Sequence, residues 1–172
     1  VRVGYMATGR PIISVDYTQW MNQKVRADRD ESLNAYGDYQ KAIGFLSKEF
    51  PPDIKKIYEY KRDQEKTPAD WEAIETFLKT ESNAIEAFRL GASKPYYWNT
   101  YKSPETSSKP GEFAAGVVSE LMPQCSGYKK IAQRMAMFQI PLDIHQGNIK
   151  QAVDDSIALY RFGQHITGQG VA

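Results

Sequence analysis

Cysteine and histidine are scarce in this chain of 172 residues, and their scarcity excludes several kinds of site. Cys125 is the only cysteine, so an intrachain disulfide, a paired-cysteine metal site and covalent haem attachment are all excluded. No histidine or strongly basic stretch accompanies Cys125, and we interpret it as an unreactive thiol. His145 and His165 are the only histidines, which leaves few ways to build a catalytic triad.

Sequence motifs for common chemistries are also missing. The chain has no G-x-S-x-G nucleophile turn, no glycine-rich phosphate loop and no H-E-x-x-H zinc motif. A metal or acid–base site shared by His145 and His165, with Asp143 or Asp155, would need the two rings to meet. In a hairpin that turns at Gly147 they would lie roughly 25 Å apart. The sequence therefore predicts no catalytic residue, no metal ligand and no cofactor.

Neither the net charge nor the length of the apolar runs indicates binding to nucleic acid or insertion into a membrane. Lysine and arginine number 22 against 21 aspartates and glutamates, so the chain has no overall field that would attract an anionic partner. It has no run of eighteen apolar residues, the length that a membrane-spanning helix needs. It begins with valine and shows no charged-then-apolar leader, so we expect that a leader was removed or that this is a piece of a longer protein.

Helical periodicity runs through most of the sequence. Apolar residues recur every three or four positions within residues 14–25, 33–50, 52–61, 68–81, 83–90, 113–121, 128–146 and 148–166. Residues 1–13 contain two glycines and a proline, which predicts an extended N-terminal arm. We expect residues 14–172 to form one all-α domain, an irregular stack of antiparallel helical hairpins with about seven or eight helices.

The segment 128–166 carries the clearest structural signals. Gly147 is expected to adopt the left-handed conformation that ends a helix, and Asn148 to cap the next one with its side chain. Pro141 is expected to kink the first helix of this hairpin. Thr67, Pro68 and Asp70 form a similarly strong start signal further upstream.

The aromatic loop at residues 94–111 is the longest stretch without helical periodicity. It holds Tyr96, Tyr97, Trp98 and Tyr101 together with three prolines. These aromatic side chains would form a docking surface for a partner, or the first of them would simply close the end of the core. With Tyr5 of the arm they are the predicted partner-binding residues.

Two resemblances add to this interpretation. The pattern Gly147, Asn148, Ala152, Asp155, Arg161, Gly163 and His165, together with ISVDY at 13–17 and KPYYW at 94–98, resembles an uncharacterised all-helical family of planctomycete-type bacteria. That resemblance implies export or a place in the bacterial cell envelope, and it implies no activity. The hairpin is also similar to a tetratricopeptide unit, although the other helices do not repeat at the interval typical of that family.

The sequence thus favours a non-catalytic protein-interaction or structural assembly subunit. It would bind a protein partner, or further copies of itself, through the arm, the aromatic loop and a groove between helices. The alternative is an enzyme or small-molecule-binding domain with a site around Asp155, Arg161 and His165. A deep pocket that gathers those three side chains and the loop tyrosines would favour the alternative, whereas a flat interface formed by the arm would favour assembly.

Overall fold

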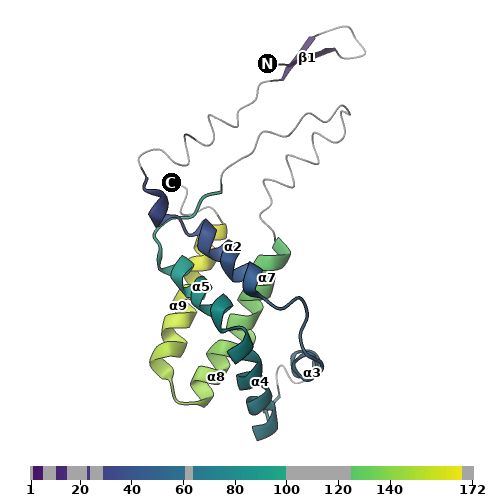
Figure 1. Ribbon diagram of the computed structural model, residues 1–172, viewed down its shortest axis with the longest axis vertical. Helices are drawn as coiled ribbons and strands as arrows, with labels where there is room; N and C mark the ends of the chain where they lie inside the picture. The colour runs from purple at the N-terminus through teal and green to yellow at the C-terminus, as the bar shows by residue number, and fades with distance from the viewer. Residues whose placement is uncertain are drawn as a thin grey trace. The chain divides into compact units, whose positions relative to one another are not determined.

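A computed structural model describes residues 2–5, 11–14, 23, 29–60, 64–99 and 125–167 (Figure 1). The chain divides into two units, one of Val1–Arg29 and Trp98–Pro123 and the other of Asp30–Tyr97 and Gln124–Ala172. In the first unit, strand β1 (Arg2–Tyr5) pairs antiparallel with β2 (Pro11–Ser14). Ser14, expected to cap a helix, therefore ends a strand. The expected helix beyond Ser14, the one over 113–121 and Tyr101 fall outside the described residues.

The regular elements in the described residues of the second unit are all helices, which confirms the all-α prediction for this unit. A 3₁₀ turn η1 (Glu31–Leu33) comes first, followed by helices α2 (Tyr36–Phe45), α3 (Pro52–Tyr60), α4 (Pro68–Thr80), α5 (Ser82–Ser93), α7 (Cys125–Arg134), α8 (Ile140–His145) and α9 (Ile149–Ile166). A π-helical turn, η2 (Met135–Gln139), joins α7 to α8. Counting α7, η2 and α8 as one irregular helix leaves six helices in this part of the chain. No helix in the described residues has both the length and the apolar character needed to cross a membrane.

A π turn lies directly before Pro141, where the sequence predicts a kink. Proline has no amide hydrogen to donate into a regular helix. In the structure the irregularity comes just before it: the Ile140 amide donates to the Met135 carbonyl, five residues back, and Pro141 follows in the first turn of α8. The wider π turn keeps the chain helical up to the proline.

Local signals in the sequence predict two of the helix ends well. Thr67 caps α4: its hydroxyl accepts from the Asp70 amide at 3.3 Å, and Asp70 Oδ2 accepts from the Thr67 amide at 2.8 Å. Gly147 has φ of 77°, which confirms the left-handed turn between α8 and α9. The side-chain cap expected from Asn148 is wrong, because Asn148 precedes α9 without bonding a helix amide.

The break between α4 and α5 lies at Glu81, close to the predicted restart near Ser82 and Asn83. The sequence suggests Asn83 as the cap, whereas Glu81 occupies the junction and turns its carboxylate into the core. Gly91 is expected to end α5, yet α5 continues to Ser93. Gly91 serves a different purpose, namely close packing.

Tyr39 is the centre of one half of the core. It is completely buried on α2, which packs against α5, and its ring lies 5.0 Å from Phe162 and 5.8 Å from Phe88 between ring centroids. A Cβ atom on Gly91 would come within 2.7 Å of this ring. Only glycine allows α5 to approach α2 so closely.

Replacing Gly91 with alanine is therefore expected to destabilise the fold by about 1–3 kcal/mol, because the buried Tyr39 ring has no room to move away from an added methyl group. Gly44→Ala is the matched control: a Cβ atom added at Gly44 would meet nothing within 4 Å, and alanine in a helix is expected to stabilise by about 0.5–1 kcal/mol. Urea unfolding of both variants measures the difference. Equal midpoints for the two variants would contradict the packing argument.

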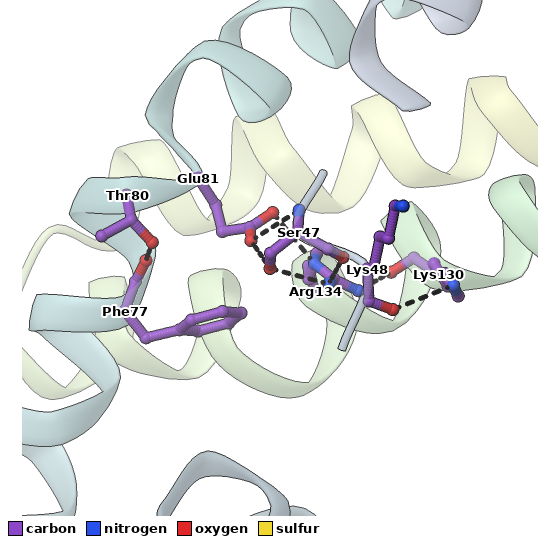
Figure 2. A network of polar contacts seen from close by, with 7 residues as sticks. All are labelled: Ser47, Lys48, Phe77, Thr80, Glu81, Lys130 and Arg134. Atoms are coloured by element: carbon purple, nitrogen blue, oxygen red, sulfur yellow. Dashed lines mark hydrogen bonds and ion pairs between the residues drawn. The ribbon is translucent and has the colours of Figure 1, made fainter. Parts of the chain in front are cut away.

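The other half of the core contains a buried ion pair. Arg134 on α7 and Glu81 are 1% exposed each, and Arg134 Nε donates to Glu81 Oε2 at 3.0 Å. Figure 2 shows how Ser47, in the α2–α3 connection, completes the network. Its amide donates to Glu81 Oε1 at 3.1 Å and its hydroxyl bonds the same oxygen, while its carbonyl accepts from Arg134 Nη2 at 3.0 Å. Three distant segments are joined at one point.

Aromatic rings enclose this pair. The Arg134 guanidinium lies 4.7 Å from the centroid of the Phe50 ring and 5.7 Å from that of Phe77. Burial lowers the pKa of Arg134, although Glu81 opposes that shift, and arginine stays protonated in proteins at any ordinary pH. The pair is thus a charged, hydrogen-bonded contact inside an aromatic cluster.

Removing only one partner of the Arg134–Glu81 pair should lower the free energy of unfolding far more than removing both. Glu81→Leu leaves the Arg134 charge buried without its carboxylate, and we expect a loss of about 3–5 kcal/mol in the free energy of unfolding. The double variant Glu81→Leu with Arg134→Met removes both charges and should lose clearly less than the sum of the single variants. Denaturant unfolding of the wild type, the two single variants and the double variant gives the double-mutant cycle. Simple additivity would show that the two groups act independently.

Candidate functional site

A hollow between α4 and α8 is the candidate site. Its volume is about 750 Å³, within the range of roughly 300–1,000 Å³ typical of ligand sites. Two aromatic side chains lie in it, Trp71 from the first turn of α4 and His145 from the end of α8. The capping box at Thr67 fixes the start of α4, and Gly147 ends α8 just beyond His145, so both side chains come from well-defined helix ends.

Trp71 and His145 stack face to face. Their ring centroids are 4.3 Å apart and the ring planes differ by only 9°. Lys66 Nζ lies 5.3 Å from the centroid of the Trp71 ring, within the range of a cation–π contact. The indole ring is therefore already used to hold one cation, which shows what kind of group it can attract.

Carboxylates outnumber cations around the stacked pair. Glu65, Glu72 and Glu75 line the hollow, against the single ammonium group of Lys66. Glu75 also pairs with Lys79 at 3.0 Å, but that contact is between exposed side chains and is worth little energy. The site is thus aromatic and acidic, a combination suited to lysine or arginine side chains.

A second hollow, of about 220 Å³, continues the first. The two share Glu75, Leu142 and Gln146 as lining residues, and the second extends toward α5, where it reaches Arg89. Together they form an elongated groove between α4, α8 and α5. An elongated groove fits an extended chain segment better than a compact small molecule.

Asp155 lies apart from the other two residues of the alternative site, whereas Arg161 and His165 are about one turn apart on α9. Asp155 is 1% exposed and receives two bonds from Arg89, Nε to Oδ1 at 2.7 Å and Nη2 to Oδ2 at 2.6 Å, with a third from Gln151 at 3.1 Å. It lies ten residues before His165 on α9, roughly 15 Å along the helix. Asp155 joins α5 to α9, and Arg161 is exposed.

His165 belongs to the tyrosine cluster at the other end of α9. A hydrogen bond of 2.8 Å joins its Nδ1 to the hydroxyl of Tyr39, and the Tyr97 ring stacks on it at 6.3 Å. Tyr97 and Tyr128 bond each other through their hydroxyls at 3.0 Å. Burial raises the pKa of Tyr39 and of Tyr97, so both remain neutral and bonded at neutral pH.

Burial, with the nearby positive charge of Arg161, lowers the pKa of His165 below its ordinary 6.5. The unfolded chain therefore takes up a proton on this residue at a higher pH than the folded one. Stability from this group is fully present above about pH 6.5 and is lost as the pH falls from there toward the lowered folded pKa.

We therefore expect the free energy of unfolding of the wild type to drop between pH 7.5 and pH 5.5 more steeply than that of His165→Gln. His145→Gln is the matched control, because it removes the only other histidine, which is exposed in the groove. Denaturant unfolding over this pH range measures the slopes. The expectation fails if both variants retain the slope of the wild type.

The predicted partner-binding aromatics occupy different settings. Tyr97 is 7% exposed and Trp98 2%, whereas Tyr96 is half-buried and its carbonyl accepts from the Ala35 amide at 2.8 Å. Tyr5 lies at the end of β1, and Tyr101 is outside the described residues. The buried Tyr97 closes the core beside Tyr39, which is the other role considered for the start of this loop. Partner binding by the set stays a prediction.

Sequence reasoning missed the groove itself. Helical periodicity predicts that Trp71 faces the core, and in the structure Trp71 packs partly against the core but also lines the hollow, where it stacks on His145. The usable signal is the charge around Trp71: Glu65, Asp70, Glu72 and Glu75 outnumber Lys66 and Lys79 over the same stretch of sequence. A tryptophan among acids at a helix start indicates a surface position.

In the described part of the chain, no group of three or more histidine, cysteine, aspartate or glutamate side chains is placed to hold a metal ion. No protein-family model, curated protein or solved structure matches this chain.

Proposed function

We propose that this chain is a protein-interaction or structural assembly subunit that binds a lysine- or arginine-bearing peptide segment of its partner in the groove between α4 and α8. The observation that carries the proposal is the Trp71–His145 stack in an acidic, elongated hollow. A lysine or arginine of the partner would take the place of Lys66 at the Trp71 ring, and the three glutamates add charge attraction. The N-terminal arm and the aromatic loop are further contact regions in this proposal.

The arrangement of α8 and α9 is consistent with a scaffold role. They form an antiparallel hairpin across Gly147, side by side in Figure 1. We infer that this hairpin is one unit of a tetratricopeptide-like stack. We infer that the hairpin holds one wall of the groove rigid, because Leu142 and His145 both come from α8. A rigid wall lowers the ordering cost of binding an extended peptide.

The test uses two fluorescein-labelled nonapeptides, one alternating lysine with alanine and one alternating glutamate with alanine, and fluorescence anisotropy at low ionic strength. We expect the lysine peptide to bind and the glutamate peptide not to bind. Trp71→Leu with Glu72→Gln should weaken binding by about fivefold to thirtyfold, since a cation–π contact and an exposed ion pair together contribute about 1–2 kcal/mol.

Glu59→Gln is the control, because Glu59 is an exposed acid on α3 that does not line the groove. Thermal melting confirms that each variant is folded. Equal binding of both peptides, undiminished binding by the groove variant, or no binding of the lysine peptide would each reject the proposal.

A further inference from the structure

Helix α9 has an apolar outer face. Ile149, Val153, Ile157 and Tyr160 follow one another at spacings of four, four and three residues, which aligns them along one side of the helix. They are 55%, 51%, 45% and 67% exposed, respectively. We name these four residues the outer stripe. In Figure 1, α9 lies at an edge of the helical unit, beside α5 and α8.

The opposite side of α9 already serves the core. Ala152, Asp155 and Phe162 are buried there, each less than 5% exposed. A helix at the surface of a monomer normally has polar residues on the side that faces water, whereas α9 is apolar on both sides. With each side chain about half exposed, the outer stripe presents an apolar area on the order of a few hundred Å², the size associated with interaction surfaces.

Charged residues lie along one flank of the outer stripe. Asp154 and Arg161 are seven residues apart, nearly two full turns, so both project from the same flank. Both are exposed. Lys150, one turn before Asp154, bonds it at 2.7 Å but is 91% exposed and stays in water. This flank therefore carries one acid and one base, and a second copy of α9 running in the opposite direction could pair with both of them.

We propose that two copies of this chain pair through the outer stripe of α9, antiparallel about a two-fold axis near Ile157. In this arrangement Asp154 faces the partner's Arg161 and Arg161 faces the partner's Asp154, which gives two equivalent ion pairs. Ile157 packs at the axis, and Val153 and Tyr160 of each copy interleave on either side. A parallel pair would instead place the charged flanks of the two copies on opposite sides of the interface, where they cannot pair.

The charge pattern is the reason to choose a second copy as the occupant. An unrelated helix would need an apolar face and matching charges of its own, whereas the antiparallel copy supplies both from the same residues. The area is smaller than that of standard stable interfaces, so the dimer should be weak and depend on concentration. This inference goes beyond the groove, and neither depends on the other.

Sedimentation equilibrium of the full chain tests the proposal. The average mass should rise with concentration from 19.5 kDa toward twice that value. Ile157→Glu should weaken association at least tenfold, whereas Phe45→Glu, which changes an apolar residue on α2 that is 55% exposed against 45% for Ile157, should leave it within about threefold. Concentration-independent monomer, or equal effects of both variants, would overturn the proposal.

A charge exchange tests the orientation. Asp154→Arg and Arg161→Asp should each weaken association, because each places two like charges opposite each other in the dimer, and combining them in one chain should restore it. Failure of the combined variant to recover would overturn the antiparallel pairing. Circular dichroism confirms folding, and lysine-peptide binding by the same variants separates this outcome from failure of the groove proposal.

Discussion

The buried contact between Arg134 and Glu81 determines how the rest of the helical unit is arranged. It joins α7 to the junction of α4 and α5, and through Ser47 it also holds the connection between α2 and α3. A buried ion pair is an uncertain source of stability compared with apolar packing, because both charges lose their water. Its role here is positional, because the three segments meet at the point where together they satisfy the guanidinium and the carboxylate.

Two further contacts extend this arrangement toward both ends of α9. At one end Gly91 lets α5 approach Tyr39, which holds His165 and Phe162 of α9. In the first half of α9, Arg89 of α5 bonds Asp155. With its inner face fixed in this way, α9 presents its outer stripe at a constant orientation. The same framework holds α8 against α4, where the groove lies.

The parts of this fold that the sequence predicts are those decided within a few residues. The Thr67 cap, the start of α3 at Pro52 and the turn at Gly147 each follow from neighbouring residues and their backbone preferences. The features it does not predict depend on distant partners. Glu81 looks like an ordinary surface acid until Arg134, 53 residues later, faces it. His145 looks like part of an apolar stripe until α4 places Trp71 against its ring. Asn148 has the right position for a cap, but the side-chain bond does not form.

The π turn at Met135–Gln139 determines which side chains of α8 face the groove. A π turn contains one residue more than an α-helical turn, so it acts as a phase shift between the two helices that it joins. Everything after it is rotated by about 100° relative to a continuous α-helix. The residues that α8 turns toward α4 are therefore set by the length of this turn, of which only Gln139 lines the groove. Loss of one residue from this turn would bring a different row of side chains to the groove while leaving α7 unchanged.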